Sequence, residues 1–350
     1  MLVEQITHGQ FEGMKREWND LLARSGLKSP MLRWEWAFTW WECYRESLVS
    51  RELYVLAVRS GDGRLEGIAP FVRRRRRQAG VSFLQVEFIG TGEAEEDETC
   101  SEFMDIISDA GRRDMVGEAV AGHMTADPGW EAIRCADVRD DGETAVGDMC
   151  KALARLPGMT LQKSGAAPCP VIRLPGAWEE YVRNLSHESR YGLRRKRRKI
   201  EETGRVEFKT VKSATELRSA LAMLADQHQA LWKSRGKPGC FASPVFKAFM
   251  EKAIERFAED GCARISSLCL DGRVVASYVN MQVADAVFYY NSGMAAGPDD
   301  RLSPGHVCLG YIIEEAIREG FKEFHFFKGR EDSYKFHWTA DAIPVSTLVV

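Results

Sequence analysis

Two stretches of the chain repeat one order of predicted elements, and this repeat limits the possible folds more than any other feature of the sequence. In Glu12–Val72 and again in Leu217–Val283, a helix precedes a Ser-Pro dipeptide that opens a second helix, which is followed by a strand, an Asp-Gly dipeptide and another strand. Asp-Gly between two strand-like runs is a strong hairpin signal. Because strands and helices alternate in both stretches, we predict two copies of one α/β fold, with a mixed sheet and flanking helices.

The repeat divides the chain into two predicted domains. With 350 residues, of which 45% are hydrophobic and 28% charged, the chain is long enough for two globular domains of ordinary size. We expect the domains to comprise residues 1–164 and 165–350. Gly165–Pro175 is rich in Ala and Pro and has the composition of a segment that crosses between them. In the second domain, Ser213 and Glu216 match a helix capping box.

Charge and cysteine usage exclude several classes of protein. The net charge of -3 gives no bulk electrostatic case for nucleic-acid binding. Nine cysteines, an odd number without a CxxC pair, indicate reduced thiols in a cytoplasmic protein, with neither a disulfide framework nor a metal site. No segment approaches the ~18 consecutive apolar residues of a membrane span, so we expect any membrane contact to be peripheral, at the inner membrane surface.

Phe288–Trp338 is the stretch whose pattern most suggests a ligand. It is predicted as strand, loop, helix and strand, with Ser303 at the helix N-cap, Pro304 at the first helical position and Gly320 as the stop. A loop of Gly, Ser and Pro that opens a helix presents N–H groups and a positive dipole end, which suit a phosphate or pyrophosphate. The alternative is an ordinary, well-capped helix in an α/β unit.

Two basic segments have competing interpretations. The five arginines of Arg73–Arg77 suit phosphates or an acidic polymer, but we expect most of them to form a solvated strand end. The predicted helix Ser186–Ile200 has so many Arg and Lys side chains that their positive charges repel one another, which makes an acidic partner plausible. That partner would be a phosphorylated substrate, an anionic membrane surface or nucleic acid. An exposed helix without a partner is the equally weighted alternative.

The order of the elements and motifs resembles the GNAT acyltransferases. The closer similarity is to the BioF2-like or CelD-like acetyltransferase domain, which is related to the FemABX peptidyl transferases with tandem GNAT-like domains. The motifs that carry the resemblance are Phe288-Tyr289-Tyr290, Ser303-Pro304-Gly305, Phe326-Phe327-Lys328-Gly329, Tyr334-Lys335 and Trp338, with Pro30, Trp34, Trp40-Trp41 and Gly67-Ile68-Ala69-Pro70 in the first half.

The sequence also departs from these families at two points. The usual GNAT pyrophosphate loop is R/Q-x-x-G-x-G/A, whereas Arg301–His306 has one glycine and a shifted spacing. The second departure is that the helical-arm insertion of the FemABX enzymes has no counterpart that we recognise in the sequence.

Another segment, from Arg190-Tyr191 to Arg195 and followed by Gly204, resembles the FemABX helix near the substrate phosphates.

The resemblance implies an N-acyltransferase that moves an acetyl or acyl group from acyl-CoA to an amine, on a sugar or an envelope polysaccharide precursor. It implies a catalytic second domain and a degenerate first domain that supports or covers the substrate cleft. A backbone N–H within Tyr289–Ser292 would polarise the thioester carbonyl. The cofactor-binding residues implied are Tyr290, Asn291, Leu302, Ser303, Pro304, Gly305 and His306.

The resemblance further suggests the groups that move protons and hold the substrate. Glu331 or Asp332 would take the proton of the attacking amine. His306 is another possible base, or a helix-capping surface histidine. Tyr334 would reprotonate the leaving thiolate, or is simply packed. The substrate-binding residues implied are Arg190, Tyr191, Arg194, Lys328 and Lys335, of which Lys335 is equally a surface lysine.

Two further functions remain open at this point. A FemABX-like transferase that uses aminoacyl-tRNA is supported by the basic helix and opposed by the net charge. A non-catalytic GNAT pair would bind a partner or an anionic surface. The acceptor, the acyl chain length and the oligomeric state are not predicted by the sequence.

Overall fold

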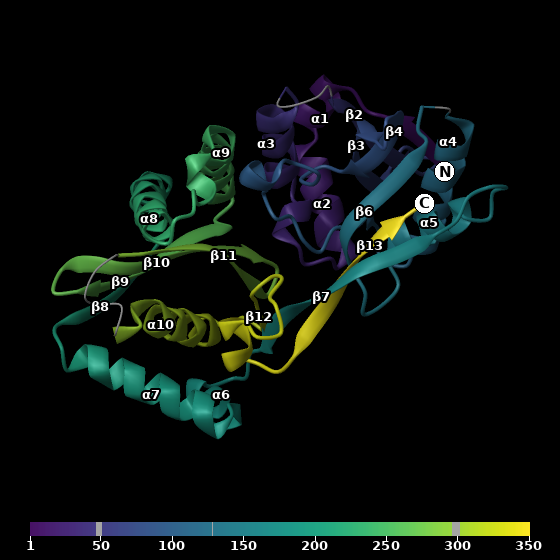
Figure 1. Cartoon of the computed structure of the whole chain (residues 1–350). Helices are drawn as coiled ribbons and strands as arrows, with labels where there is room; N and C mark the ends of the chain where they lie inside the picture. The colour runs from purple at the N-terminus through teal and green to yellow at the C-terminus, as the bar shows by residue number, and fades with distance from the viewer. Residues whose placement is uncertain (47–50, 128, 296–301) are drawn as a thin grey trace. The chain divides into compact units, whose positions relative to one another are not determined.

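The computed structural model describes residues 1–46, 51–127, 129–295 and 302–350. Its contacts divide the chain into two compact units, Met1–Ala167 with Ile343–Val350, and Pro168–Ala342. The division falls at Ala167, close to the expected boundary after residue 164. The last segment of the chain returns to the first unit, which the division into 1–164 and 165–350 did not anticipate. Each unit is a mixed sheet with flanking helices (Figure 1).

The sheet of the first unit is antiparallel except at one pair of strands. β4 and β6 are parallel, with Gln85 opposite Ala132 and Glu87 opposite Arg134. The first helix of the repeat, which we predict from its pattern to cover Glu12–Arg24 with Trp18, Leu21 and Leu22 on one face, is divided between α1 and α2, and these three residues are buried. The strands in sheet order are β1 (Leu2–Gln5), β2 (Arg51–Arg59), β3 (Leu65–Gln78), β4 (Val81–Phe88), β6 (Ala132–Arg139) and β13 (Ala342–Val349), with β5 (Ile107–Ser108) beside β3; the helices are α1 (His8–Gly13), α2 (Lys15–Ser25), α3 (Trp34–Tyr44), α4 (Arg113–Ala126) and α5 (Ala145–Leu153).

The arginine run of the first unit lies within β3 rather than beyond its end. Arg73 and Arg74 are buried, where Arg73 pairs with Asp127 and Arg74 with Glu87. The remaining three arginines are exposed or half-buried, as expected of a solvated strand end. The two buried arginines therefore neutralise internal carboxylates, which a buried charge requires.

The sheet of the second unit repeats this arrangement, again with one parallel pair, β11 and β12. α8 and α9 cover one face of the sheet, and α10 and α7 lie on the other (Figure 1). The strands in sheet order are β7 (Gln162–Arg173), β12 (Glu323–His325), β11 (Ala286–Met294), β10 (Arg273–Val283), β9 (Ala263–Leu270) and β8 (Val206–Val211); the helices are α6 (Trp178–Asn184), α7 (His187–Glu201), α8 (Ala214–Ser234), α9 (Pro244–Glu259) and α10 (Pro304–Arg318), with short 3-10 helices η3 (Cys240–Ala242) and η5 (Tyr334–His337).

The predicted repeat is confirmed element by element. The series β1, α2, a 3-10 turn, α3, β2, β3, β4, α4 and β6 has the same order as β8, α8, η3, α9, β9, β10, β11, α10 and β12. Each sheet is then completed by a strand from elsewhere in the chain, β13 in the first unit and β7 in the second. Gly165–Pro175 crosses from the first unit to the second between Ala167 and Pro168, as expected, and most of it belongs to β7.

Three serines that precede helices differ in what their side chains do. Ser243 accepts a hydrogen bond from the Phe246 N–H and caps α9 as its Ser-Pro signal predicts. The predicted capping box at Ser213 is wrong, because its hydroxyl donates to the Glu216 carboxylate and accepts no hydrogen bond from a helix N–H. Ser303 makes no side-chain cap bond to α10, which corrects the expectation for that residue.

We predict that Ser243→Ala destabilises the protein by about 1 kcal/mol, the usual effect of losing an N-cap oxygen. Ser213→Ala is the matched control, since that serine also precedes a long helix but caps no backbone N–H. It should change the free energy of unfolding by less than about 0.5 kcal/mol. Urea titration of both variants measures the difference, and equal losses would contradict the capping role of Ser243.

Candidate active site

The parallel pair of strands in the second unit separates after a few residues. β11 and β12 are paired only where Ala286–Phe288 of β11 lies beside Glu323–His325 of β12. Beyond that point the chain after β12 bonds to β7, where the Phe326 and Gly329 N–H groups donate to Pro170 and Pro168. β11 instead stays paired with β10 as far as Met294. The sheet therefore has a point at which neighbouring strands no longer share hydrogen bonds.

A β-bulge lies on β11 just past this point. Asn280 is opposite Tyr289, and Val279 is opposite Asn291, so the register between β10 and β11 skips Tyr290. Bulges re-aim side chains and backbone groups and are common next to active sites. The predicted cofactor residues Tyr290 and Asn291 thus lie at the irregular part of the strand.

The residue that precedes α10, Ser303, has an unusual backbone conformation. Ser303 has φ of 53° and ψ of 52°, a left-handed conformation that few non-glycine residues adopt. Pro304 follows at the first helical position, as predicted. A Cβ on Gly305 would lie 2.7 Å from the Met294 methyl group and 3.2 Å from the Tyr278 hydroxyl, so glycine lets the helix start close to the sheet. Arg301, the first residue of the predicted loop, lies outside the described residues.

Three tyrosines join the start of α10 to the bulged strand. The Tyr278 hydroxyl donates to the Gly305 carbonyl at 2.9 Å. Tyr334 donates to the Tyr289 hydroxyl at 3.1 Å, and the Tyr289 hydroxyl lies 3.0 Å from Ser292 Oγ. Desolvation raises the pKa of all three phenols, although the Tyr334 side chain is 43% exposed, so they are protonated at neutral pH. Tyr334, the predicted proton donor, therefore carries the proton that this role requires.

The predicted carboxylates are on the exposed turn before η5. Glu331 and Asp332 are both exposed. Asp332 accepts two hydrogen bonds from Arg330, at 3.1 and 3.0 Å. Glu331 makes no hydrogen bond or ion pair within the described ranges. Neither carboxylate is bonded to the tyrosine hydroxyls, and their assignment as bases stays a prediction.

The two predicted substrate lysines differ in their surroundings. Lys335 Nζ donates to the carbonyl oxygens of Phe326 and Lys328 at 2.6 and 2.5 Å and to that of Phe327 at 3.3 Å. Lys335 thus holds the segment that follows β12, a use that neither sequence interpretation included. Lys328 is half-buried in that same segment.

His306 is in the first turn of α10 and is not a surface histidine. Its ring centroid lies 4.4 Å from that of Trp338. Burial, with the nearby charges of Lys196 and His337, lowers the pKa of His306 to about 3. The imidazole is therefore neutral at physiological pH and is a weak base.

Lys196 is a candidate anion-binding residue that the sequence analysis missed. α7 packs on α10 through Leu193 and Ile200, which are buried. Lys196 lies between them on that face, because residues three and four apart in a helix are neighbours. Burial and Arg195 lower its pKa. The spacing of Leu193 and Ile200 was the signal that could have identified this lysine.

The three predicted substrate-binding residues of α7 make no hydrogen bond to the tyrosines described above. Arg190 donates to the Arg183 carbonyl at 2.9 Å, Tyr191 is 59% exposed, and Arg194 is exposed. Arg197, in contrast, bonds to Glu314 of α10 at 2.8 Å. The tyrosine contacts link Gly305 to β10 and Tyr334 to β11 beside the bulge that holds Tyr290 and Asn291. Arg190, Tyr191 and Arg194 are on the outer part of α7.

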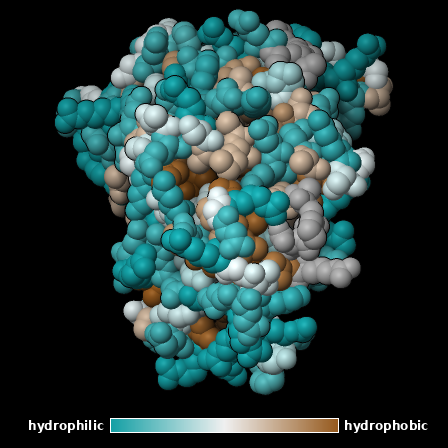
Figure 2. Space-filling model, turned by 90° about the vertical axis from the view of Figure 1, so that its left-hand side faces the viewer, coloured by the Kyte–Doolittle hydropathy of each residue, from teal (hydrophilic) through white to brown (hydrophobic). Residues whose placement is uncertain are grey.

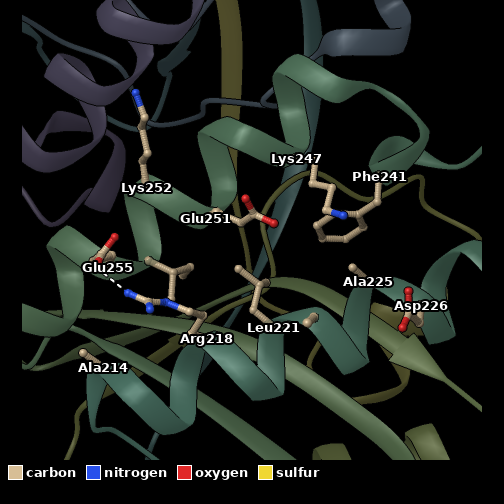
Figure 3. Close-up of a pocket in the computed structure, with 12 residues that line it drawn as sticks. Ala214, Arg218, Leu221, Ala225, Asp226, Phe241, Lys247, Glu251, Lys252 and Glu255 are labelled. Carbon is tan, nitrogen blue, oxygen red and sulfur yellow. Dashed lines mark hydrogen bonds and ion pairs between the residues drawn. The ribbon is translucent and has the colours of Figure 1, made fainter.

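The described cavities lie elsewhere in the second unit. A groove of about 520 Å³ runs between α8 and α9, where Arg218 of α8 pairs with Glu255 of α9 at 2.7 Å (Figure 3). Another, of about 440 Å³, lies between the first turn of α7 and Phe336–Asp341. None of the predicted site residues lines either one. Among the described residues, no group of His, Cys, Asp and Glu could hold a metal ion.

A membrane-spanning helix requires both length and apolar character. Hydrophilic side chains predominate on the face shown in Figure 2, with apolar residues scattered between them. Within the described ranges, the helices are all too short or too polar to cross a bilayer.

We predict that His306 makes stability depend on pH. Because the folded state holds the pKa of His306 near 3 instead of 6.5, the unfolded chain binds an extra proton between these values. The free energy of unfolding should therefore fall as the pH drops from about 6.5 towards about 3. His306→Phe, which keeps a ring beside Trp338, should flatten this slope. His187→Phe, at an exposed histidine, should not, and identical slopes in chemical denaturation at several pH values would contradict the assignment.

Comparison with known proteins agrees with the geometry. Residues 187–335 match the family model of the acetyltransferase (GNAT) domain. No curated protein matches the chain. FemX matches over 99% of this chain and 97% of its own, with a TM-score of 0.62 and 13% identity. The C-terminal domain of a putative lysylphosphatidylglycerol synthetase from Agrobacterium fabrum matches over 98% and 92%, with a TM-score of 0.55 and 10% identity.

A third structure, L-PGS from Bacillus licheniformis, matches over 99% of this chain and 93% of its own, with a TM-score of 0.51 and 11% identity. At these identities the similarity concerns the fold alone. It extends over both units of the chain. The parted strands, the bulge and α10 all lie in the segment that matches the family model of the acetyltransferase (GNAT) domain.

Proposed function

We propose that the chain transfers an acyl group from acyl-CoA to an amine. The observation that carries the proposal is the coincidence of three features in the GNAT domain: β11 and β12 part, β11 bulges at Tyr290, and α10 begins beside them. A thioester placed at the bulge would meet backbone N–H groups of Tyr290 and Asn291. Such donors stabilise the oxyanion that forms when an amine attacks the carbonyl.

The start of α10 would hold the pyrophosphate of the same ligand. Leu302, Ser303, Pro304, Gly305 and His306 form the turn, and helix N-termini attract anions through their N–H groups and dipole. Lys196, whose charge is close enough to affect His306, would supply a cation beside this turn.

Tyr334 and Glu331 would move the protons. The Tyr334 phenol is protonated and bonded to Tyr289, so it would give a proton to the departing thiolate. Glu331, which is exposed and makes no ion pair in the described chain, would take the proton of the amine through water. Asp332 is the second candidate for this base, with its carboxylate already paired to Arg330.

The acceptor is proposed by family resemblance. It is an amino group on a sugar or an envelope polysaccharide precursor, as the similarity to BioF2-like and CelD-like domains implies. Arg190, Tyr191, Arg194 and Lys328 would contact it. A cytoplasmic location, with peripheral contact at the inner membrane surface, fits an acceptor of this kind.

The test is calorimetric titration of acetyl-CoA and longer acyl-CoAs into Ser303→Asp and Ser303→Asn. Asp and Asn tolerate the left-handed conformation of Ser303, so both variants should fold. The carboxylate of Ser303→Asp would repel the pyrophosphate and weaken acyl-CoA binding by about tenfold or more, since like charges this close repel strongly near a surface. Ser303→Asn has nearly the same shape without the charge and should bind almost as the native protein does.

Failure of the native protein to bind any acyl-CoA would overturn the proposal. Equal weakening in the two variants would show that the residue matters by shape, and would remove the pyrophosphate from this position.

A second candidate function is transfer from aminoacyl-tRNA. The observation that favours it is the outer part of α7, where Arg194, Arg195, Arg198 and Lys199 are all exposed. Exposed cations along one helix can follow a phosphate backbone.

We expect this candidate, if correct, to give salt-dependent binding of a tRNA acceptor hairpin that Arg194→Glu/Arg198→Glu removes. Lys247→Glu/Lys252→Glu on α9 is the control, because it reverses the same number of exposed charges on another helix. Fluorescence anisotropy at several salt concentrations measures both. Absence of binding would exclude tRNA, and equal loss in both variants would indicate a bulk charge effect. A chain that binds neither acyl-CoA nor RNA would be a non-catalytic GNAT pair.

A further inference from the structure

A cysteine and a histidine form a bonded pair on the face of the second sheet that α8 and α9 cover. Cys240 is half-buried in η3, which connects α8 to α9. Its Sγ lies 3.3 Å from Nε2 of His228 on α8, and both residues belong to the second unit. A thiol within hydrogen-bond reach of an imidazole is the arrangement of an activated nucleophile.

The tautomer of His228 follows from its other contact. His228 Nδ1 lies 2.9 Å from the Ser292 carbonyl oxygen, which can only accept a hydrogen bond. Nδ1 therefore carries the proton, and Nε2 presents its lone pair to the Cys240 S–H. Burial lowers the pKa of His228, so the ring is neutral and able to accept a proton. The imidazole is thus oriented as a base for this thiol.

Other groups are placed to stabilise a thiolate at Cys240. Asn291 Nδ2 donates to Sγ at 3.4 Å, and the Asn291 side-chain oxygen is fixed by the Ser292 N–H at 2.7 Å. Burial raises the pKa of the Cys240 thiol, while Asn291 and the backbone amides of Cys240 and Phe241 oppose that rise. The thiol is consequently neutral at rest, and charge on the sulfur would form only as His228 removes the proton.

The pair lies beside the bulged strand because α8 approaches β11 very closely. A Cβ on Gly293 would be 2.4 Å from the Leu224 carbonyl oxygen, so only glycine permits this approach. His228 follows Leu224 by one helical turn and reaches the β11 backbone at Ser292. Asn291, which contacts the thiol, is the next residue after the bulge at Tyr290. The thiol is therefore adjacent to the position at which the thioester carbonyl would be polarised.

α10 and the Cys240–His228 pair approach β11 from opposite faces of the sheet. Tyr278 and Tyr289 connect β10 and β11 to the α10 side, whereas α8 lies on the other face (Figure 1). Beyond Phe288, β11 and β12 share no ladder hydrogen bonds. A ligand with its phosphates at α10 and its acyl end between the parted strands would direct that end towards the face of Cys240.

We propose that Cys240 accepts the acyl group from acyl-CoA as a covalent thioester, with His228 as its base, before the amine receives it. This inference rests on the proposed acyl-CoA function, adds an intermediate to it, and assigns to His228 the two proton transfers given above to Tyr334 and Glu331. His228 Nε2 takes the S–H proton, the thiolate attacks the thioester carbonyl carbon, and the C–S bond to CoA breaks. The CoA thiolate leaves with the proton from His228. No oxidant or further reactant is required, because one thioester replaces another.

The second half of the reaction returns the enzyme to its starting state. The amine attacks the carbonyl carbon of the Cys240 thioester, and the bond to Sγ breaks as the amide forms. One amine proton passes to His228 and from there to the departing Cys240 thiolate. Asn291 and the two backbone amides stabilise the sulfur charge in both half-reactions.

The test is intact-mass analysis of the full chain after incubation with acetyl-CoA or octanoyl-CoA in the absence of any amine acceptor, with the reaction stopped in acid. We expect one added acyl group, located on Cys240 by peptide mapping and removed by neutral hydroxylamine, which cleaves thioesters. Cys240→Ala should abolish this labelling, and His228→Gln should slow it by about tenfold or more, within the usual contribution of a general base. Cys262→Ser, at another half-buried thiol of the same unit, is the matched control and should label as the native protein does.

Calorimetric binding of the same acyl-CoAs distinguishes the two proposals. Binding without acylation of Cys240 would overturn the covalent intermediate and leave the acyltransferase intact. Labelling that His228→Gln does not slow, or that reaches Cys262 equally, would also overturn it, because the thiol would then have no special activation. Absence of binding would overturn both proposals. Circular dichroism of each variant ensures that lost labelling is not lost folding.

Discussion

The early end of the parallel pair is the constraint on which the candidate site depends. β12 pairs with β7 on one edge and with β11 on the other, but only the pairing with β7 continues past His325. There the Pro170 and Pro168 carbonyls accept hydrogen bonds from the Phe326 and Gly329 N–H groups. The backbone of β11 beyond Phe288 therefore lacks one neighbouring strand, and the bulge at Tyr290 lies just past that point. An opening between strands otherwise leaves polar groups without partners, so β7 is as necessary to the site as β11.

Polar groups are arranged around this region so that little net charge is buried. On the side of α10, protonated tyrosines, a neutral histidine and helix N–H groups surround the parted strands. On the side of α8, the Cys240–His228 pair is neutral at rest. A neutral, preorganised environment costs little to keep folded and responds strongly when charge develops, which is the general condition for electrostatic catalysis. The cations of α7 that could bind phosphate remain nearer the surface, where solvation limits their cost.

Much of the fold could be predicted from the sequence because its signals are local. The Asp-Gly dipeptides identified the hairpins in both copies, and the element order disclosed the tandem repeat. Ser243-Pro244 identified the start of α9, whereas Ser29-Pro30 opens a 3-10 turn and α3 begins only at Trp34. The predictions that failed also have physical causes. Ser213 and Ser303 were predicted as caps from their residue type and position alone. The Ser213 hydroxyl bonds to a carboxylate instead, and Ser303 has a left-handed backbone conformation. Gly165–Pro175 was recognised by composition as the crossing segment, but its strand character was not predicted, because a strand can carry prolines where only its carbonyls are needed.

Of the candidate site, the sequence by itself determined the segments: the strand with Tyr290 and Asn291, the turn at Ser303–Gly305, and the basic helix. It could not determine which side chains meet, because contacts between distant residues depend on packing and not on local pattern. Only the tertiary structure shows that Cys240 contacts His228 and Asn291. It also shows that Lys335 donates to backbone carbonyls, and that Lys196, among several similar cations of α7, lies near His306. The physical reason is that helix propensity and turn chemistry act over a few residues, whereas the close approach of α8 to β11 at Gly293 is fixed by the whole sheet.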